Sequence, residues 1–235
     1  MITTRTRIVC AVAAGLLWNA PGVAAQTASQ GSELYHIHAV KAAPGKLLEL
    51  IDAYKAAPAP DEGQPQVTPI ILRHRQGGEW DILVISPRGA ETTVSAGQPS
   101  ADARALNERL ATLSAWHADS FAAGPAWDAV RQALLPDPDA GTPVFVVSDY
   151  RAIPGHRPQL RQALEGGQAG ASGSVLLTHV EGAPWNFLHV TRYASWADLG
   201  TPPPSPQQQG IAAREHMAVH HDTVATYVAG GAPIR

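Results

Sequence analysis

The chain has 235 residues, of which 17 are Lys or Arg and 20 are Asp or Glu, so its formal charge is −3. This mild acidity and the lack of a basic cluster argue against nucleic acid as a partner. A single cysteine excludes an intramolecular disulfide framework and every paired-cysteine metal motif.

The first 25 residues have the pattern of a secretory signal peptide. Arg5 and Arg7 precede a short apolar run, residues 8–17, and small residues lead to a cleavage site after Ala25. The run is shorter than the roughly 20 residues that span a bilayer; an uncleaved anchor or a core helix is the alternative. We expect a periplasmic or secreted bacterial protein. Its mature form keeps 15 basic and 20 acidic residues, a charge of −5, with no further membrane segment and no cysteine.

Three features recur in the remaining chain, in the same order and at nearly constant offsets. The matched residues are Lys41 and Arg151 of two basic-Ala-x-Pro-Gly segments at an offset of 110, His74 and His179 with Trp80 and Trp185 at 105, and the His-x-Asp motifs His117/Asp119 and His220/Asp222 at 103. Chance similarity would not keep this order. The sequence therefore predicts a duplication, with one repeat at 26–139 and the other at 140–235.

Each repeat predicts the element order β-α-β-β-α. A strand rich in β-forming residues comes first, then a helix after a Pro-Gly turn, then an apolar hairpin, then a second helix. In the two repeats these lie at 34–40 and 143–150, 46–55 and 157–165, 70–86 and 175–191, and 101–122 and 211–229. The order is that of a ferredoxin-like unit, whose short last strand residues 143–146 could partly supply.

One such unit would leave one face of its sheet bare, whereas two can bury both faces. We therefore expect an α+β protein with two tandem ferredoxin-like repeats that form an intramolecular α/β barrel. With this order and duplication, the chain resembles the dimeric α/β-barrel superfamily in a fused, two-repeat form. That superfamily includes antibiotic-biosynthesis-type monooxygenases, stress-responsive barrels, and polyketide cyclase-like, EthD-like, NIPSNAP-like and haem-binding chlorite dismutase-like proteins. The resemblance implies a fold more than a chemistry.

The His-x-Asp motifs lie in the predicted second helices. At about 100° per residue, His117 and His220 face inward and the aspartate two residues later faces solvent. We therefore expect neither Asp119 nor Asp222 to pair with the histidine of its own motif.

The resemblance implies a pocket between the sheet and the helices of a repeat, with one histidine on the first strand and another on the second helix. His36 and His38 share one strand face and would converge there with His117. His117 would be the general base, and His36 or His38 would orient or polarise the substrate. Because Val146 and Ser148 stand at the corresponding strand positions of the second repeat, we expect at most one working site.

Further side chains are candidate walls for an apolar or aromatic ligand. They are His216, His220, Tyr227, Trp80, Trp185 and Tyr35. For the two tryptophans, which follow the hairpin turns, a structural cross-strand role is the alternative.

No metal or cofactor is predicted. The pairs His36/His38 and His216/His220 have spacings that can share a metal ion, but neither has an obvious third ligand. A divalent metal, or haem ligated by His220, remains an alternative. The sequence contains no Gly-x-Ser-x-Gly, phosphate-binding loop or dinucleotide fingerprint.

We expect an exported protein that binds a small apolar or aromatic molecule, as a cofactor-independent enzyme of monooxygenase or cyclase/isomerase type. The alternative is a non-catalytic periplasmic binding or assembly module in which the histidines are packing residues. A homo-oligomer is compatible with both. A cavity that touches His36 or His38 together with His117 would favour the enzyme.

Overall fold

The structure is a computed structural model, which describes residues 33–59, 65–90, 99–135, 141–165, 168, 170–200 and 213–231. The predicted signal peptide lies outside these residues. The strands are β1 (Glu33–Ala42), β2 (Ile70–Gln76), β3 (Ile82–Ala90), β4 (Ser114–Gly124), β5 (Val144–Ala152), β6 (Gly173–Glu181), β7 (Phe187–Tyr193) and β8 (Met217–Ala229). The helices are α1 (Leu47–Lys55), α2 (Ala101–Leu113), α3 (Trp127–Leu134), α4 (Arg157–Leu164) and α5 (Trp196–Leu199).

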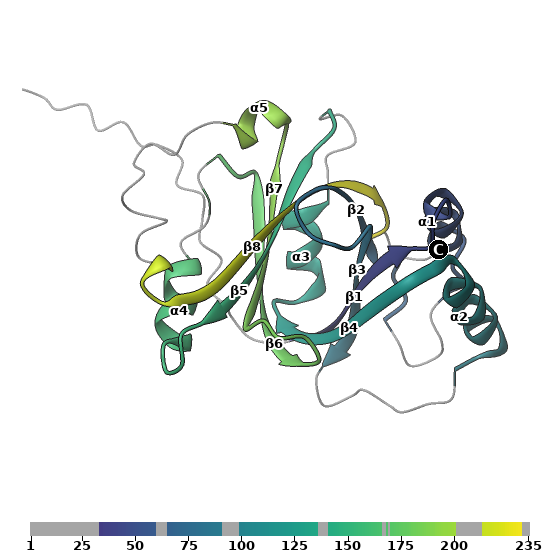
Figure 1. Ribbon diagram of the computed structural model, residues 1–235, viewed down its shortest axis with the longest axis horizontal. Helices are drawn as coiled ribbons and strands as arrows, with labels where there is room; N and C mark the ends of the chain where they lie inside the picture. The colour runs from purple at the N-terminus through teal and green to yellow at the C-terminus, as the bar shows by residue number, and fades with distance from the viewer. Residues whose placement is uncertain are drawn as a thin grey trace, which may run out of the picture.

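The strands form a closed antiparallel barrel in the order β1-β3-β2-β8-β5-β7-β6-β4 (Figure 1). The first half of the chain supplies the run β4-β1-β3-β2, and the second half supplies the run β8-β5-β7-β6. The two halves meet where β2 pairs with β8 and β4 pairs with β6. Closure pairs each of these strands on both sides, so none of them is left as an edge.

Apolar side chains fill the barrel interior. Every second residue of each strand points inward, and among these Tyr35 and Phe145 are fully buried. The amphipathic helix α3 adds Trp127 and Val130 to the same cluster. The guanidinium of Arg192, at the end of β7, donates to a carbonyl of α3, so this helix lies against one end of the barrel.

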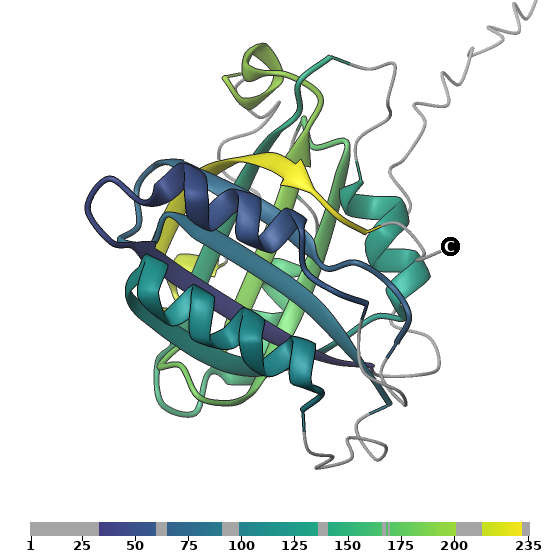
Figure 2. The ribbon, with the colours of Figure 1, turned by 90° about the vertical axis from the view of Figure 1, so that its right-hand side faces the viewer.

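Two further apolar clusters lie on the outer face of the barrel, beneath helices. Figure 2 shows α1 and α2 side by side over the first-half strands; Leu50 of α1 packs there against Val40 and Val84. On the second half, Leu160 of α4 packs against Phe187. The first half of the sheet is thus a layer between the filled interior and α1 and α2. None of the described helices is long and apolar enough to cross a membrane.

The first strand, first helix and hairpin of each half form where they are predicted. The predicted second helices are wrong at residues 114–122 in the first half and at residues 217–229 in the second half, where the chain forms strands. The first of these helices ends at Leu113 and continues directly into β4, while residues 217–229 form β8. Of residues 143–146, which were expected to supply a last strand of the first half, residues 144–146 belong to β5. Helix α3 was not predicted.

The physical reason for the error is that non-local pairing overrides a weak local preference. The alanines around β4 favour a helix by tenths of a kcal/mol to about 1 kcal/mol each, whereas in the barrel β4 forms ladders with both β1 and β6. In β8 the β-branched Thr223, Val224 and Thr226 favour a strand locally.

Candidate active site

Strand β1 places two histidines on the face that the helices cover. Its odd-numbered residues Tyr35 and Ile37 belong to the interior cluster, so His36 and His38 point outward. Strand β4 is the antiparallel neighbour, and Asp119 lies opposite His38. Because alternate residues of a strand share a face, the side chains of His117 and Phe121 point outward with that of Asp119.

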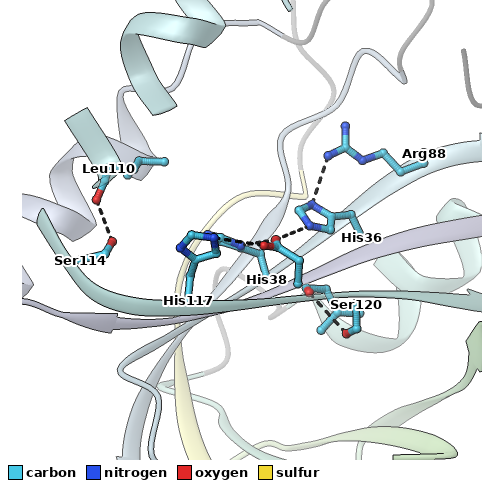
Figure 3. Close-up of polar contacts among 9 residues, drawn as sticks. His36, His38, Arg88, Leu110, Ser114, His117 and Ser120 are labelled. Carbon is cyan, nitrogen blue, oxygen red and sulfur yellow. Dashed lines mark hydrogen bonds and ion pairs between the residues drawn. The ribbon is translucent and has the colours of Figure 1, made fainter. Parts of the chain in front are cut away.

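The expectation that Asp119 points away from the histidine of its own motif is wrong. In a strand, His117 and Asp119 lie on one face, whereas the predicted helix would separate them. The Oδ1 atom of Asp119 lies 2.6 Å from both Nε2 of His36 and Nδ1 of His38, and its Oδ2 atom lies 3.3 Å from Nε2 of His117. Three imidazoles therefore surround one carboxylate (Figure 3). These are the three histidines that the sequence predicts to converge.

Arg88 of β3 determines which nitrogen of His36 carries the proton. Its Nη2 donates to Nδ1 of His36 at 3.1 Å. A guanidinium has donors only, so Nδ1 holds a lone pair and Nε2 donates its proton to Asp119. A neutral His38, which approaches the same oxygen through Nδ1, donates from that atom and keeps a lone pair on Nε2. Nε2 of His38 is thus the atom of this pair that is able to accept a proton.

The electrostatics of the cluster favour neutral imidazoles beside an ionised carboxylate. Burial lowers the pKa of both His36 and His38, and at His36 the positive charge of Arg88 lowers it further, although Asp119 opposes both effects. Burial alone would raise the pKa of Asp119, but hydrogen bonds from His38 and His36 outweigh it and hold this pKa below its usual range.

The cluster, defined as His36, His38, His117 and Asp119, is partly open to solvent and is flanked by aromatic rings. The side chains of His36 and His38 are 18% exposed and that of Asp119 is 42% exposed. The ring of Phe121 stacks on His36 with 5.2 Å between centroids, and Tyr54 of α1 lies edge-on to His38 at 6.2 Å. A planar ligand that entered from solvent would therefore meet both proton-transfer groups and aromatic surface.

The second half supports the strand that carries Asp119. Gly182, in the hairpin between β6 and β7, has a φ of 104°, and a Cβ there would overlap the carbonyl oxygen of Asp119. Gly77 of the first-half hairpin has the same relation to Asp222. Only glycine combines this φ with so close an approach. The hairpin of each half thus packs on the aspartate-bearing strand of the other.

The second half contains a reduced version of the cluster. Asp222 of β8 lies opposite Ser148 of β5 and accepts hydrogen bonds from Ser148 Oγ at 2.5 Å and from Nε2 of His220 at 2.8 Å. The expected separation of His220 from Asp222 is therefore also wrong. The ring of His220 stacks on Tyr150 with 4.6 Å between centroids. Its hydrogen bond to Asp222 raises the pKa of His220.

Three residues of the first-half cluster are also a candidate metal site. His36, His38 and Asp119 each offer one ligand atom, all within 4.8 Å of one another, so Asp119 supplies the third ligand that the sequence lacked. Two ligands of one tetrahedral zinc ion would lie roughly 3.4 Å apart, but here nitrogen and oxygen are 2.6 Å apart. A metal-bound histidine also directs its second nitrogen at an acceptor, whereas His36 faces Arg88. The arrangement fits a hydrogen-bonded cluster better than a metal ion.

The remaining predicted ligand-binding residues lie away from this cluster. Tyr35 and Trp185 are buried in the interior cluster, and Trp80 and Tyr227 pack against it. Trp80 and Trp185 lie edge-on to His74 and His179 respectively, as the structural alternative for these tryptophans requires. Nδ1 of His216 lies 3.0 Å from Nδ1 of His156. His220, the candidate haem ligand, has its Nε2 atom bonded to Asp222.

Sequence reasoning missed Asp119, Arg88 and Tyr54. For Asp119 a signal was present: the small residues Ala118, Ser120 and Ala122 alternate with larger ones, which indicates a strand. Arg88 and Tyr54 have no local signal, because only sheet pairing and helix packing bring them to the histidines.

A cavity of about 100 Å³ lies between the end of α1 and strands β2 and β8. Tyr54 lines it together with Val67, Ile71 and Ala229, and its lining includes none of the three histidines. The cavity that would favour the enzyme is therefore not this one. The histidines lie on an open outer face beside it, and Tyr54 is common to both.

No family model and no curated protein matches the chain. An anthrone oxidase-like protein superposes with a TM-score of 0.61 at 14% identity, over 86% of this chain and 94% of that chain. Two proteins, each named "putative monooxygenase", from Lactobacillus acidophilus and Fusobacterium nucleatum, have TM-scores of 0.56 and 0.57 at 12% and 8% identity, over 86% of this chain and 95% of theirs. The chain thus has the α/β-barrel fold of these monooxygenase-like proteins, as the resemblance implied. At these identities the likeness extends to the fold alone.

Proposed function

We propose that the protein is a cofactor-independent enzyme in which His38, oriented by Asp119, removes a proton from a conjugated small molecule. The observation that carries the proposal is the 2.6 Å contact between Nδ1 of His38 and Asp119, which leaves Nε2 of His38 as a lone pair on a partly open face. A carboxylate that orients an imidazole and stabilises its protonated form is a common device in proton-transfer enzymes.

In the proposed step, Nε2 of His38 accepts a proton as a C–H or O–H bond of the substrate breaks. The electron pair of that bond moves into the conjugated system of the substrate, and Asp119 stabilises the imidazolium. Because burial lowers the pKa of His38, this base is neutral at pH 7. His117, the base expected from the sequence, is 57% exposed and lies 3.3 Å from Asp119, and it passes the proton on to solvent.

The anthrone oxidase-like neighbour suggests the substrate class. An anthrone is an enolisable aryl ketone, so removal of one methylene proton gives a conjugated enolate. With dioxygen as the co-reactant, the enolate yields the quinone and one water. The flanking Phe121 and Tyr54 rings suit such a planar molecule.

The proposal also includes the finer architecture that the sequence suggests. A duplicated ferredoxin-like unit, with repeats at 26–139 and 140–235, is supported by the identical strand order of the two halves and by their matching His–Trp contacts. Export to the periplasm or medium, with cleavage near Ala25, rests on the leader sequence.

The experiment is proton exchange on anthrone. The purified protein is incubated with anthrone in D₂O without oxygen, and loss of the methylene proton signal is followed by NMR; quinone formation is then followed in air. We expect exchange above the buffer rate, insensitive to EDTA, and at least about 100-fold slower in His38→Ala. Equal rates for wild type, His38→Ala and buffer would refute the proposal. Loss of activity on chelation, restored by a metal ion, would replace it with a metal mechanism.

A non-catalytic binding module is the second candidate. The filled barrel interior and the absence of the histidines from the lining of the described cavity favour it. In that case anthrone or a related aromatic compound would raise the melting temperature without any exchange.

A further inference from the structure

We propose that the Tyr54 hydroxyl donates a hydrogen bond to the substrate oxygen on which negative charge develops. The substrate then carries a carbonyl oxygen next to the carbon that loses the proton, or a phenolic oxygen that loses the proton itself. This inference rests on the proposed function and deepens it. It assigns to Tyr54 a hydrogen bond that none of the described residues supplies.

The first observation is an unsatisfied hydroxyl. The Tyr54 side chain is only 8% exposed, and its Oη atom is buried with no hydrogen-bond partner among the described residues. A buried polar group without a partner costs about 1 to 3 kcal/mol, and a ligand oxygen that accepted this hydrogen bond would remove the cost. By contrast, the buried hydroxyl of Tyr35 donates to the carbonyl of Pro125.

The second observation is the position of this side chain. Tyr54 lies in the last turn of α1, and its ring is edge-on to His38 with 6.2 Å between centroids. Burial and the nearby negative charge of Asp119 raise the pKa of Tyr54, so the hydroxyl stays protonated and acts as a donor. Arg88 donates to His36 from β3, and Tyr54 offers a neutral donor from α1.

The third observation is the cavity beside it. Tyr54 lines the cavity of about 100 Å³ whose other walls include Val67, Ile71 and Ala229. This space suits an apolar edge or substituent of a substrate whose oxygen faces Tyr54 and whose acidic position faces His38. In the second half, the matching position at an offset of 110 is Leu164, which has no donor group and is buried in an apolar cluster.

The step is balanced without any change at Tyr54. The C–H bond of the substrate breaks, its proton moves to Nε2 of His38, and its electron pair moves through the adjacent carbon to the carbonyl oxygen. The Oη–H group of Tyr54 donates to that oxygen as the negative charge develops. Preorganised donors of this kind accelerate such steps by about 10- to 1000-fold.

The test compares Tyr54→Phe with Tyr193→Phe, which removes the hydroxyl of a buried tyrosine in the second half. Anthrone exchange gives kcat and KM, 4-nitrophenolate binding is measured by its absorbance as a mimic of the oxyanion, and thermal melting reports the fold. For Tyr54→Phe we expect kcat to fall at least about 10-fold with a smaller change in KM, phenolate affinity to fall about 10-fold, and the melting temperature to stay the same or rise. Tyr193→Phe should match the wild type in exchange and in phenolate binding.

Each outcome either supports or overturns the assignment of Tyr54 as the donor. If Tyr54→Phe retains full kcat while His38→Ala does not, the oxyanion assignment is wrong and the proposed base stands. If Tyr54→Phe lowers the melting temperature by several degrees, the hydroxyl has a structural partner and the inference fails. If the wild type does not catalyse exchange, the proposed function fails, and equal phenolate affinity in wild type and Tyr54→Phe would then overturn the donor role as well.

Discussion

The outer faces of the two halves share one backbone register but differ in chemistry. His38 lies opposite Asp119 in the first half, and Ser148 lies opposite Asp222 in the second. Three imidazoles surround Asp119, whereas Asp222 accepts hydrogen bonds from one serine and one histidine. Equivalent strand pairs thus carry an aspartate at the same position in both halves, and the side chains around each aspartate determine what its carboxylate can do.

The difference also reverses the electrostatics of the histidines. Burial lowers the pKa of His38, while the hydrogen bond to Asp222 raises the pKa of His220. The His38 side chain is 18% exposed and the His220 side chain is 34% exposed, so desolvation dominates in the first half and the carboxylate dominates in the second. The first arrangement provides a neutral base, and the second provides a stabilised cation.

The largest effect on the exchange rate is expected when His38 is replaced by serine, the residue at the matching position 148 of the second half. His38→Ser should lower anthrone exchange about 1000-fold, because it removes the base. The fold should survive, since Ser148 already forms the equivalent hydrogen bond to Asp222. The measurement is NMR exchange together with circular dichroism. Ser148→His is the matched control and should leave exchange within about twofold, because Leu164, and not a tyrosine, stands at the position that matches Tyr54. A fully active His38→Ser variant would show that the base is elsewhere.

Replacing Asp119 and Asp222 one at a time distinguishes a role in orienting the base His38 from a role in folding. Asp119→Asn should slow exchange about 100-fold, because the amide no longer stabilises the imidazolium of His38. Without the opposing charge the pKa of His38 falls further, so the acid limb of the pH–rate profile should move to lower pH. Asp222→Asn should change neither the rate nor the profile. Equal losses in both variants would point to a shared structural role.

His189 of β7 should make stability depend on pH. Burial lowers its pKa to about 4, so the unfolded state takes up a proton at a higher pH than the native state does. Stability is therefore full above about pH 6.5, falls as the pH drops towards 4, and loses about 2 to 3 kcal/mol over that window. His189→Val, which introduces the residue of the matching position Val84, should abolish this contribution. Urea unfolding at pH 4.5 and 7.5 measures it, and an unchanged pH dependence in the variant would contradict the assignment.

The smallest effect is expected at His220, whose contribution to stability should change with pH in the opposite direction to that of His189. Because its pKa is raised in the native state, its ion pair with Asp222 stabilises the fold below about pH 6.5 and is lost as the pH rises through the native pKa. Both partners are partly exposed, so the contribution should be no more than about 0.5 kcal/mol. His220→Gln should therefore lose slightly more stability at pH 5.5 than at pH 8.5, and high salt should reduce the difference. A larger loss at pH 8.5 would show that stacking on Tyr150 matters more than charge.

Local patterns predicted several parts of the site. The His-x-His spacing placed His36 and His38 on one face, and the repeat offsets identified Ser148 as the counterpart of His38. Convergence with His117 was predicted as well, although on the basis of a helix that ends at Leu113, before it reaches this residue. The role of Asp119 could not follow from that helix, because a 100° periodicity sends the two ends of His-x-Asp to different sides.

By itself, the sequence determined the hairpins, the first strand and helix of each half, and the shared face of the two β1 histidines, because these depend on residues close together in the chain. Only the tertiary structure decided that residues 114–124 form a strand and that this strand lies beside β1. The ladders with β1 and β6 join residues far apart in the chain, and their combined stability exceeds a weak local helix preference. That pairing brings Asp119 to His36 across 83 residues. The proposed active site therefore exists only where β4 pairs with β1.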